Sequence, residues 1–384
     1  MTDSAILAIR KLTLTDFRNY AGLRLRAPAM LVALVGANGA GKTNILEAIS
    51  LLAPGRGLRT APFGELARHG GAPSWAVAAE LETAEGLTSI GTGWSGQSEA
   101  GDGGGRLVVI DGEVQKTAGA LGGHIRLLWL TPAQDRLFAG PASDRRRFLD
   151  RLVAAFDPEH ATRAAVFERL MRERNLLLED LRPDTAWLAS LEAQMAEAAV
   201  AISAARLVGL EALRTHIMEA RSESSFPWAE VAVEGEIEAL VAAKPAVQVE
   251  DEYRRILNDS RGLDRAAGRS LRGPHRSDLA VVHGPKGMPA GDCSTGEQKA
   301  LLIGLVLAQA RAVKAEAGVA PLLLLDEVAA HLDRARRGSL LEALAALGSQ
   351  SWMTGTDAQL FEAIGRAGAV FTVEDGSVRE TMET

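Results

Sequence analysis

A loop of eight residues near the start of the chain constrains the fold more than any other feature. Residues Gly36 to Thr43 read G-A-N-G-A-G-K-T and follow the apolar run 30–35. Residues 44–52 come next, with apolar side chains at helical spacing. A buried strand, a glycine-rich turn and a helix start together direct backbone N–H groups at an anion. The sequence therefore predicts a phosphate-binding loop in an α/β fold.

Residue types within this loop fit a nucleoside triphosphate. We expect the backbone to cradle the phosphates, Lys42 to reach the β and γ phosphates, and the Thr43 hydroxyl to bind Mg²⁺. The predicted cofactors are ATP and Mg²⁺, and Lys42 is also a candidate catalytic residue. The candidate nucleotide-binding residues are Gly36, Ala37, Asn38, Gly39, Ala40, Gly41, Lys42, Thr43 and Asn44.

A second motif lies near the other end of the chain. Four leucines, 322–325, precede Asp326 and Glu327. This run predicts a buried parallel strand that delivers two carboxylates at its C-terminal end, where ligands of α/β sheets bind. Alone, the two acids could be a surface feature, but the phosphate loop in the same chain favours a site. We expect Asp326 to hold Mg²⁺, directly or through water, and Glu327 to polarise the attacking water.

A third motif, S-T-G-E-Q, covers Ser294, Thr295, Gly296, Glu297 and Gln298. By itself it could be a capped helix start without a ligand. Its place about 30 residues before the Asp326 strand favours an anion site built from hydroxyl and N–H donors. About 250 residues separate it from the phosphate loop, so a large segment is inserted between them.

The organisation along the chain predicts an α/β head with mixed sheets and a helical insertion. Alternating residues indicate strands at 6–17, 23–25, 30–35, 76–81, 86–91 and 106–113, with a glycine-rich loop at 93–105. We expect head residues 1–140, a helical insertion at 141–265, and the rest of the head at 266–384.

The segment 142–220 predicts two long helices joined at Pro183. Apolar residues three and four apart favour a coiled-coil-like antiparallel hairpin, and an ordinary bundle stays open on spacing alone. Arg174 interrupts the first seam. The expected seam residues are Leu170, Leu177 and Leu181 in the first helix, and Leu188, Leu191, Met195, Ala198, Ile202 and Ala205 in the second.

Charge and composition limit the partners and the compartment. The net charge of −7 argues against nucleic acid, yet arginines gather at 145–151 and at 254–276. These clusters predict either basic binding surfaces or solvated ion pairs. No apolar run is long enough to cross a bilayer, and the start of the chain does not resemble a signal peptide. With a single cysteine, Cys293, the chain is expected in the cytoplasm, without a membrane partner.

Together the three motifs resemble the ABC-type ATPase head. The resemblance implies that Ser294 and Gly296 contact the γ phosphate bound by an opposite subunit, so that ATP is sandwiched in a homodimer. The leucine strand continues as L-L-L-L-D-E-V-A-A-H-L-D, and Asp333 then matches the D-loop aspartate of such heads.

Longer motifs are similar to the RecF family over nearly the whole chain. In D-F-R-N-Y, residues 16–20, the resemblance to SMC and RecF heads implies that Arg18 and Asn19 approach the nucleotide. The stretches G-P-A-S-D-R-R-R-F-L-D, 140–150, and G-P-H-R-S-D-L, 273–279, resemble RecF specifically.

Membership of this family implies a weak, DNA-stimulated ATPase of recombinational repair. It would clamp double-stranded DNA at gaps or junctions, act with RecR and RecO, and help load the RecA recombinase. The candidate DNA-binding residues are Arg145, Arg146, Arg147, Arg272 and Arg276.

The sequence departs from transporter-type heads where these carry a histidine after the last core strand. Here S-W-M-T-G-T-D, 351–357, has none, so Thr354 or Thr356 is the candidate sensor, and Gln134 is the candidate magnesium-sensing glutamine. Two other function classes use a similar ATPase head. A transporter subunit would have its S-T-G-E-Q motif closer to the phosphate loop, and an SMC-like tether would need much longer helical arms.

Overall fold

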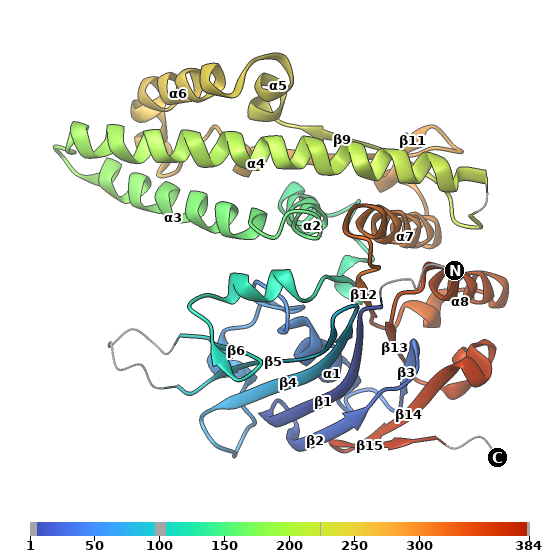
Figure 1. Cartoon of the computed structure of the whole chain (residues 1–384). Helices are drawn as coiled ribbons and strands as arrows, with labels where there is room; N and C mark the ends of the chain where they lie inside the picture. Colours follow the sequence, from blue (N-terminus) through green and yellow to red (C-terminus); the bar gives the residue numbers. More distant parts are fainter. Residues whose placement is uncertain (1–5, 97–104, 223, 382–384) are drawn as a thin grey trace. The chain divides into compact units, whose positions relative to one another are not determined.

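The computed structural model describes residues 6–96, 105–222 and 224–381, which fall into two compact units (Figure 1). Unit 1 combines residues 1–135 with 302–384, and unit 2 comprises 136–301. The second boundary differs from the expected one at 265, because strand β10 (Asp278–His283) pairs with β9 (Ala229–Glu234) inside unit 2. The pentapeptide beginning at Ser294 therefore belongs to unit 2.

The central sheet of unit 1 is the buried, mostly parallel sheet that the apolar runs predict. Its leucine strand β12 is buried at all four positions, as expected for a strand covered on both faces. The edge strand β15 pairs antiparallel, and the other pairings are parallel. In order across the sheet, its strands are β15 (Ser377–Glu380), β14 (Gly368–Glu374), β3 (Leu31–Val35), β13 (Ser351–Gly355), β12 (Leu322–Leu325) and β8 (Leu127–Leu130).

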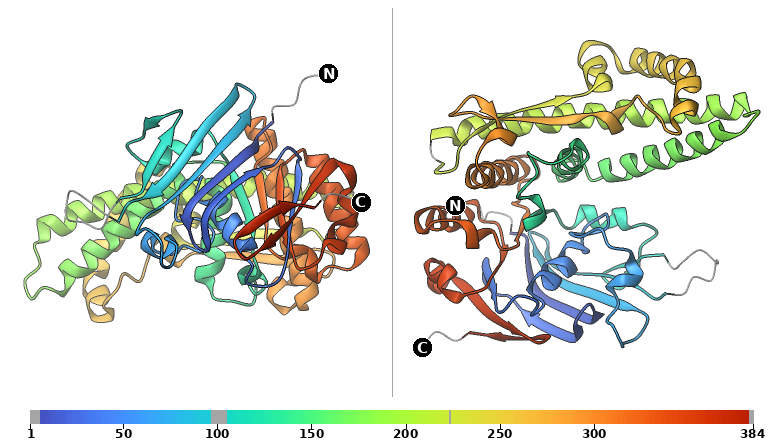
Figure 2. Two further views of the ribbon diagram at one scale, coloured as in Figure 1. Left: turned by 90° about the horizontal axis from the view of Figure 1, so that it is seen from below. Right: turned by 180° about the vertical axis from the view of Figure 1, so that it is seen from behind.

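A second sheet of unit 1 is antiparallel and is seen beside the first in Figure 2. The β1–β2 hairpin pairs with the consecutive strands β4 to β7 through β1 and β4. Strand β5 reaches Trp94, so the glycine-rich segment begins within a strand. Residues 97–104 of that segment lie outside the described residues, and the expected loop there stays a prediction. The strands, in order, are β2 (Tyr20–Arg26), β1 (Ala8–Phe17), β4 (Trp75–Thr83), β5 (Gly86–Trp94), β6 (Leu107–Ile110) and β7 (Glu113–Val114).

One buried amide joins the two sheets of unit 1. The Nε2 atom of Gln350 donates to the carbonyls of Ile9, at 3.0 Å, and Ala29, at 3.1 Å. Its Oε1 atom accepts from the Ile9 backbone N–H at 2.8 Å. A fully buried amide is tolerated here because both of its polar atoms have partners. Gln350 thus fixes β1 against the segment that leads into β13.

Helix α1 (Lys42–Ser50) follows the phosphate loop, and Arg106 closes its far end. The Arg106 guanidinium donates to the carbonyls of Leu51, Ala53 and Gly55, which follow the helix. A helix end leaves carbonyl oxygens without intrahelical partners, and a cation there satisfies them. Burial lowers the pKa of Arg106 to about 10. The α/β head is completed by α8 (Arg334–Leu347).

Residues 142–220 form three α-helices, α2, α3 and α4, where the sequence predicted two. The first predicted helix is split because Pro158 follows α2, and its ring cannot be accommodated inside a helix. The prediction of a single break at Pro183 was therefore wrong. The helices are α2 (Ala142–Ala154), α3 (His160–Glu179), α4 (Thr185–Glu219), α5 (Glu236–Ala243), α6 (Ala246–Ala267) and α7 (Thr295–Ala317), of which α7 continues into unit 1. A small sheet has the order β11 (Met288–Pro289), β10, β9.

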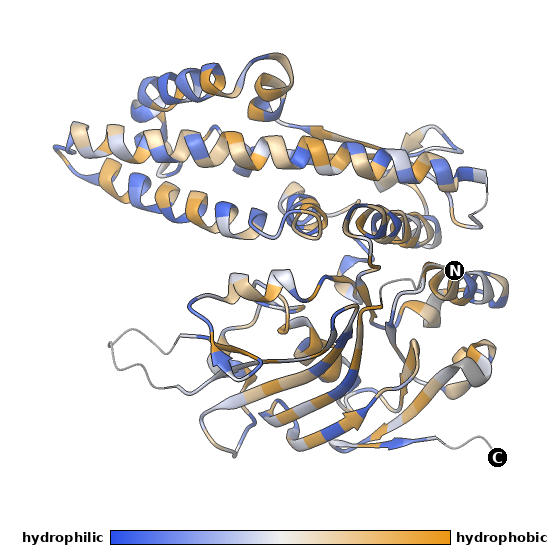
Figure 3. Ribbon diagram, viewed as in Figure 1, coloured by the Kyte–Doolittle hydropathy of each residue, from blue (hydrophilic) through white to orange (hydrophobic). Residues whose placement is uncertain are grey.

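The expected hairpin is formed by α3 and α4, which lie side by side in both views of Figure 2. Polar and apolar residues alternate along α4 in Figure 3. Leu170, Leu191 and Met195 are buried in its core, in agreement with the seam. Leu181 is 91% exposed at the tip, so its assignment to the seam was wrong. It follows the end of α3 and therefore has no facing helix.

Arg174, which interrupts the apolar seam in sequence, connects three helices of unit 2 through buried hydrogen bonds. Its fully buried guanidinium bonds to Glu192 on α4 at 3.0 Å and to Asp264 on α6 at 2.8 Å. It also donates to the Leu257 carbonyl and the Ser270 hydroxyl. Buried charges are retained where they are paired and hydrogen-bonded.

Among the residues that the structure describes, none of the helices combines the length and the apolar character that a membrane span requires.

Candidate functional site

The phosphate loop has the backbone that its glycines predict. Strand β3 ends at Val35, and Gly36 and Gly41 have φ of +155° and +110°. A Cβ atom at Gly36 would lie 2.3 Å from the Val373 carbonyl oxygen, and one at Gly41 would lie 2.4 Å from Asn19 Nδ2. Both positions require glycine, for conformation and for space. The predicted order of strand, loop and helix is confirmed.

Lys42 is folded onto the loop that precedes it. Its Nζ atom donates to the carbonyls of Gly36, at 2.7 Å, and Ala37, at 2.9 Å. Burial lowers the pKa of Lys42, and the charges of Glu327 and Asp326 act in the opposite direction. The Lys42 ammonium thus lies inside the loop, where its two acceptors are neutral carbonyl oxygens. An anion would form stronger hydrogen bonds with it and could replace them.

Three hydroxyl and carboxylate groups meet at the ends of α1, β12 and β13. The Thr43 hydroxyl donates to Asp326 Oδ1 at 2.9 Å, although the two residues are 283 positions apart. Thr354, fully buried at the end of β13, donates to the same oxygen at 2.7 Å and accepts from the Glu327 backbone N–H at 2.8 Å. Glu327 has a φ of +53°, which is uncommon for a non-glycine residue. Thr354 therefore holds both acidic residues.

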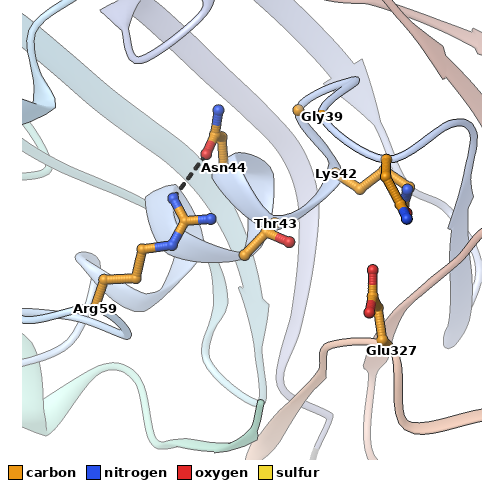
Figure 4. Close-up of a pocket in the computed structure, with 8 residues that line it drawn as sticks. Gly39, Lys42, Thr43, Asn44, Arg59 and Glu327 are labelled. Atoms are coloured by element: carbon orange, nitrogen blue, oxygen red, sulfur yellow. Dashed lines mark hydrogen bonds between the residues drawn. The ribbon is translucent and has the colours of Figure 1, made fainter. Parts of the chain in front are cut away.

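A pocket of about 190 Å³ opens at the loop (Figure 4). Lys42 and Glu327 point toward one another across it in the figure. Its lining residues are Asn38, Gly39, Gly41, Lys42, Thr43, Asn44, Arg59 and Glu327. The structure thus brings together the predicted loop and the predicted catalytic carboxylate, in one cleft of unit 1.

Arg18 and Asn19 bond to the phosphate loop and to α1, and their approach to a nucleotide stays a prediction. Asn19 donates to the Ala40 carbonyl at 3.2 Å and accepts from Asn44 Nδ2 at 2.8 Å. Arg18 forms a two-pronged ion pair with Glu47, with both distances at 2.8 Å. These contacts tie the β1–β2 turn to the loop and the first turns of α1.

Sequence reasoning missed Arg59 and Glu47. Arg59 lies in an irregular segment after α1, where no periodicity or motif marks it, so nothing in the sequence identified it. Glu47 did carry a signal, because it is a charged residue within the apolar run 45–49 of a buried helix. Such a residue needs a partner, and Glu47 has two arginines.

The S-T-G-E-Q pentapeptide starts α7 in unit 2. The Ser294 backbone N–H donates to the Glu297 carboxylate at 3.1 Å, which is one half of a capping box. Lys286 pairs with Glu297 at 2.6 Å, and these hydrogen bonds, the one from Lys286 above all, lower the pKa of Glu297 to about 2. Gln298 Nε2 donates to the Cys293 carbonyl at 2.8 Å. No described atom lies within 4 Å of a Cβ built on Gly296, so space is open above it.

The remaining sensor candidates have different surroundings. Gln134 accepts from the Thr131 N–H at 3.0 Å, while its buried Nε2 atom has no partner among the described residues. Thr356 is exposed, in contrast to Thr354. Asp333 caps α8 by accepting from the Arg336 N–H at 2.8 Å, and its side chain is 62% exposed. Of the two threonines, the structure therefore favours Thr354.

The five candidate DNA-binding arginines fall into two groups, those bonded inside unit 2 and those exposed at the surface. Arg145 forms a two-pronged pair with Asp278, at 2.8 and 2.6 Å, and Arg146 donates to the Ser277 carbonyl at 2.8 Å. These bonds join the two RecF-like stretches to each other inside unit 2. Arg147 pairs with Asp144, and Arg272 with Glu236, at the surface. Arg276 is exposed and has no ion pair with the described residues. The alternative of ion pairs with acids therefore holds for three of the five, Arg145, Arg147 and Arg272.

The donor set at Asp326 fits Mg²⁺ only together with a ligand. Within residues 6–96, 105–222 and 224–381, no group of three or more His, Cys, Asp and Glu side chains could hold a metal by itself. Mg²⁺ in nucleotide sites keeps waters and phosphate oxygens around one or two protein ligands. The Thr43 hydroxyl and the Asp326 carboxylate, 2.9 Å apart, are oxygen ligands of that kind.

Known proteins resemble this chain over its whole length. The family model described as RecF/RecN/SMC N terminal domain matches residues 8–379. The DNA replication and repair protein RecF of Mesorhizobium japonicum is 51% identical, covering 98% of both chains. That of Rhizobium leguminosarum bv. trifolii is 50% identical, covering 97% of this chain and 99% of the relative.

Solved structures support the fold. The recombination mediator protein RecF-ATPrS in the RecFOR pathway matches with a TM-score of 0.85 and 23% identity, over 98% of each chain. An Smc head bound to the C-winged helix domain of ScpA matches with a TM-score of 0.54 and 16% identity, over 97% of this chain and 96% of that chain. The predicted ABC-type ATPase head with a helical insertion is confirmed.

Proposed function

This chain belongs to the RecF family, and from that premise we propose that it is an ATP-driven switch of DNA replication and repair. One observation carries the proposal. Thr43 of the phosphate loop and Asp326 of the distant β12 strand are hydrogen-bonded, with Glu327 in the same pocket. This is the arrangement that a nucleoside triphosphatase needs, because it sets a magnesium-binding pair next to a carboxylate that can polarise water.

In the proposed site, the loop N–H groups and Lys42 bind the phosphates of ATP. Lys42 would exchange its bonds to the Gly36 and Ala37 carbonyls for stronger bonds to phosphate oxygens. Mg²⁺ held by Thr43 and Asp326 would offset the charge of the phosphates. Glu327 would orient the attacking water and accept its proton.

A second copy of the chain would complete the site. We propose that Ser294, Thr295 and Gly296 of one copy meet the γ phosphate held by the other, since Gly296 is open above and Ser294 offers a hydroxyl. ATP would then bind two chains at once and shift the monomer–dimer equilibrium by mass action. We propose that Asp333, as the D-loop aspartate, and Thr354, as the sensor residue, lie near the nucleotide bound in the dimer and respond to whether it is ATP or its hydrolysis product.

The proposed dimer clamps duplex DNA at gaps or junctions, and slow, DNA-stimulated hydrolysis releases it. Of the five arginines, Arg147, Arg272 and Arg276 are the better candidates for phosphate contact, because they are exposed. We propose RecR with RecO as partners, RecA as the recombinase that is loaded, and a cytoplasmic, nucleoid-associated location. The structural relatives are recombination mediator proteins of the RecFOR pathway, which supports RecR and RecO as partners.

Two variants test the switch. Lys42→Ala should abolish nucleotide binding, and Glu327→Gln should retain ATP and accumulate as dimer. Light scattering with ATP measures the dimer directly. A mass for Glu327→Gln equal to that of the wild-type protein without ATP would remove the switch from the proposal.

DNA binding is tested with labelled duplex, single-stranded and gapped DNA, with and without ATP, across a salt series. The clamp predicts tighter binding with ATP and a steep loss of affinity with salt, because phosphate contacts release counterions. Affinity that does not depend on nucleotide would contradict the clamp while leaving the ATPase in place.

A further inference from the structure

Glu47 is a buried carboxylate outside the phosphate loop. It lies on α1, one turn beyond Thr43, and its side chain is 2% exposed. Arg18 Nε donates to Oε2 at 2.8 Å and Arg18 Nη2 donates to Oε1 at 2.8 Å. Arg59 Nη1 donates to Oε2 at 3.0 Å. One carboxylate thus receives three hydrogen bonds from two guanidinium groups.

Neither arginine is held by regular secondary structure. Arg18 is in the β1–β2 turn with a φ of +53°, and Arg59 is in the irregular segment after α1. Two cations that share one carboxylate oxygen would repel each other without it. A two-pronged guanidinium–carboxylate pair fixes orientation as well as distance. Glu47 is therefore the partner that the two guanidinium groups share, while Arg18 Nη1 also donates to the Glu65 carbonyl at 2.9 Å.

Arg59 connects this cluster to the pocket. Its Nη1 atom also donates to Asn44 Oδ1 at 2.9 Å, and the residue lines the pocket with Lys42. Among the described residues, its Nε and Nη2 atoms have no hydrogen bond. Since Nη1 is occupied by Glu47 and Asn44, the unoccupied donors are those that a pocket ligand could use.

We propose that Glu47 is a positioning residue of the nucleotide pocket, whose buried carboxylate holds Arg59 at the rim and braces it with Arg18. The inference rests on the proposed function, namely that this pocket binds a nucleoside triphosphate. Glu47 does not contact the ligand. It acts by holding an arginine so that little side-chain entropy is lost when the ligand binds.

A purely electrostatic role makes the opposite prediction. A carboxylate near a triphosphate repels it, so removing the charge would tighten binding. A purely structural role predicts a general loss of stability with no selective effect on the pocket. Weaker ATP binding by a Glu47 variant would exclude the purely electrostatic role. Loss of that effect when Arg59 is also substituted would exclude the purely structural role.

The experiment measures ATP dissociation constants by calorimetry for the full chain and its Glu47→Gln, Arg59→Met and double variants. We expect Glu47→Gln to weaken ATP binding about tenfold, equivalent to about 1.4 kcal/mol. The turnover rate at saturating ATP should change less than about twofold, since Glu47 does not touch the reacting atoms. In the Arg59→Met background, the same substitution should weaken binding less than about twofold.

Glu192 offers a matched control. Its side chain is 3% exposed and also accepts from two arginines, Arg174 and Arg261, but it lies in unit 2. Glu192→Gln should lower the melting temperature and leave the ATP dissociation constant unchanged. If Glu47→Gln does not fold, Glu47→Asp keeps the charge with a shorter reach and should still weaken ATP binding at least about threefold.

Unchanged or tighter ATP binding by the Glu47 variants would overturn the inference alone. Equal weakening by Glu47→Gln and Glu192→Gln would also overturn it, because it would show a general structural effect. Failure of the wild-type chain to bind ATP would instead overturn the proposed function, and this inference with it.

Discussion

Thr354 is the residue that joins the two carboxylates of the pocket. Its hydroxyl donates to Asp326 and accepts from the Glu327 N–H, so it fixes both a side chain and a backbone. Glu327 has a left-handed backbone conformation, which persists only where neighbouring contacts impose it. The position of the proposed catalytic carboxylate therefore depends on a hydroxyl group from a neighbouring strand.

We predict that Thr354→Val lowers the turnover rate of ATP hydrolysis by roughly 10- to 100-fold, because small misplacement of a catalytic group is costly. Nucleotide affinity should change by less than about threefold, since the phosphate loop is untouched. Steady-state kinetics and calorimetry measure the two. Thr356→Val is the control, as Thr356 is exposed and has no hydrogen bond with other described residues. Equal turnover for both variants would contradict the role given to Thr354.

A second prediction at this scale concerns Glu297 at the start of α7. The Lys286 hydrogen bond and the Ser294 bonds lower its pKa to about 2, from 4.5. The folded state thus favours the carboxylate, and this contribution to stability is complete above about pH 4.5 and is lost as the pH falls toward 2. Lys286→Met should raise the pKa of Glu297, as measured by NMR titration. An unchanged value would show that the ion pair is not formed in solution.

Among the secondary-structure elements, those with strong local patterns were predictable and those fixed by distant partners were not. The four buried leucines of β12 and the strand, loop and helix around Lys42 follow from local sequence. The helix break at Pro158 also has a local cause, because a proline ring cannot be accommodated inside a helix.

Arg174, in contrast, interrupts an apolar seam when the sequence is read alone. Its partners on α4 and α6 are 18 and 90 residues away, and no periodicity reveals them. The same holds for the site, where the loop and acidic strand were predicted but the Glu47 and Arg59 pair was not. Sequence spacing shows which residues share a face of one helix, whereas these contacts are made between separate elements.

The hairpin therefore allows a stability prediction at the scale of elements. Arg174→Met should lower the free energy of unfolding by about 3–5 kcal/mol, because it leaves Asp264 buried without a cation and Glu192 with Arg261 alone. Arg169→Met, on the exposed face of α3, removes a pair with Glu173 and should cost less than about 0.5 kcal/mol. Urea denaturation of the full chain measures both. A cost for Arg174→Met as small as that of the control would mean that the buried network contributes little.

On the scale of the whole molecule, the central question is whether the S-T-G-E-Q motif acts on the nucleotide of its own chain or of another. The motif lies in unit 2 and the phosphate loop lies in unit 1. Their separation in sequence fits either arrangement, within one chain or between two chains. In a two-fold dimer, each composite site would take the loop from one chain and the motif from the other.

Mixing two inactive variants distinguishes these arrangements. Lys42→Ala removes the loop function and Ser294→Arg blocks the motif, so each homodimer has no complete site. A mixed dimer would contain one complete site, formed by the loop of the Ser294→Arg chain and the motif of the Lys42→Ala chain. With equal amounts and random pairing, half of the dimers are mixed, so hydrolysis should recover to at most about a quarter of the wild-type rate. If the motif acts within its own chain, both chains of every dimer are defective, and the mixture should be as inactive as either variant alone.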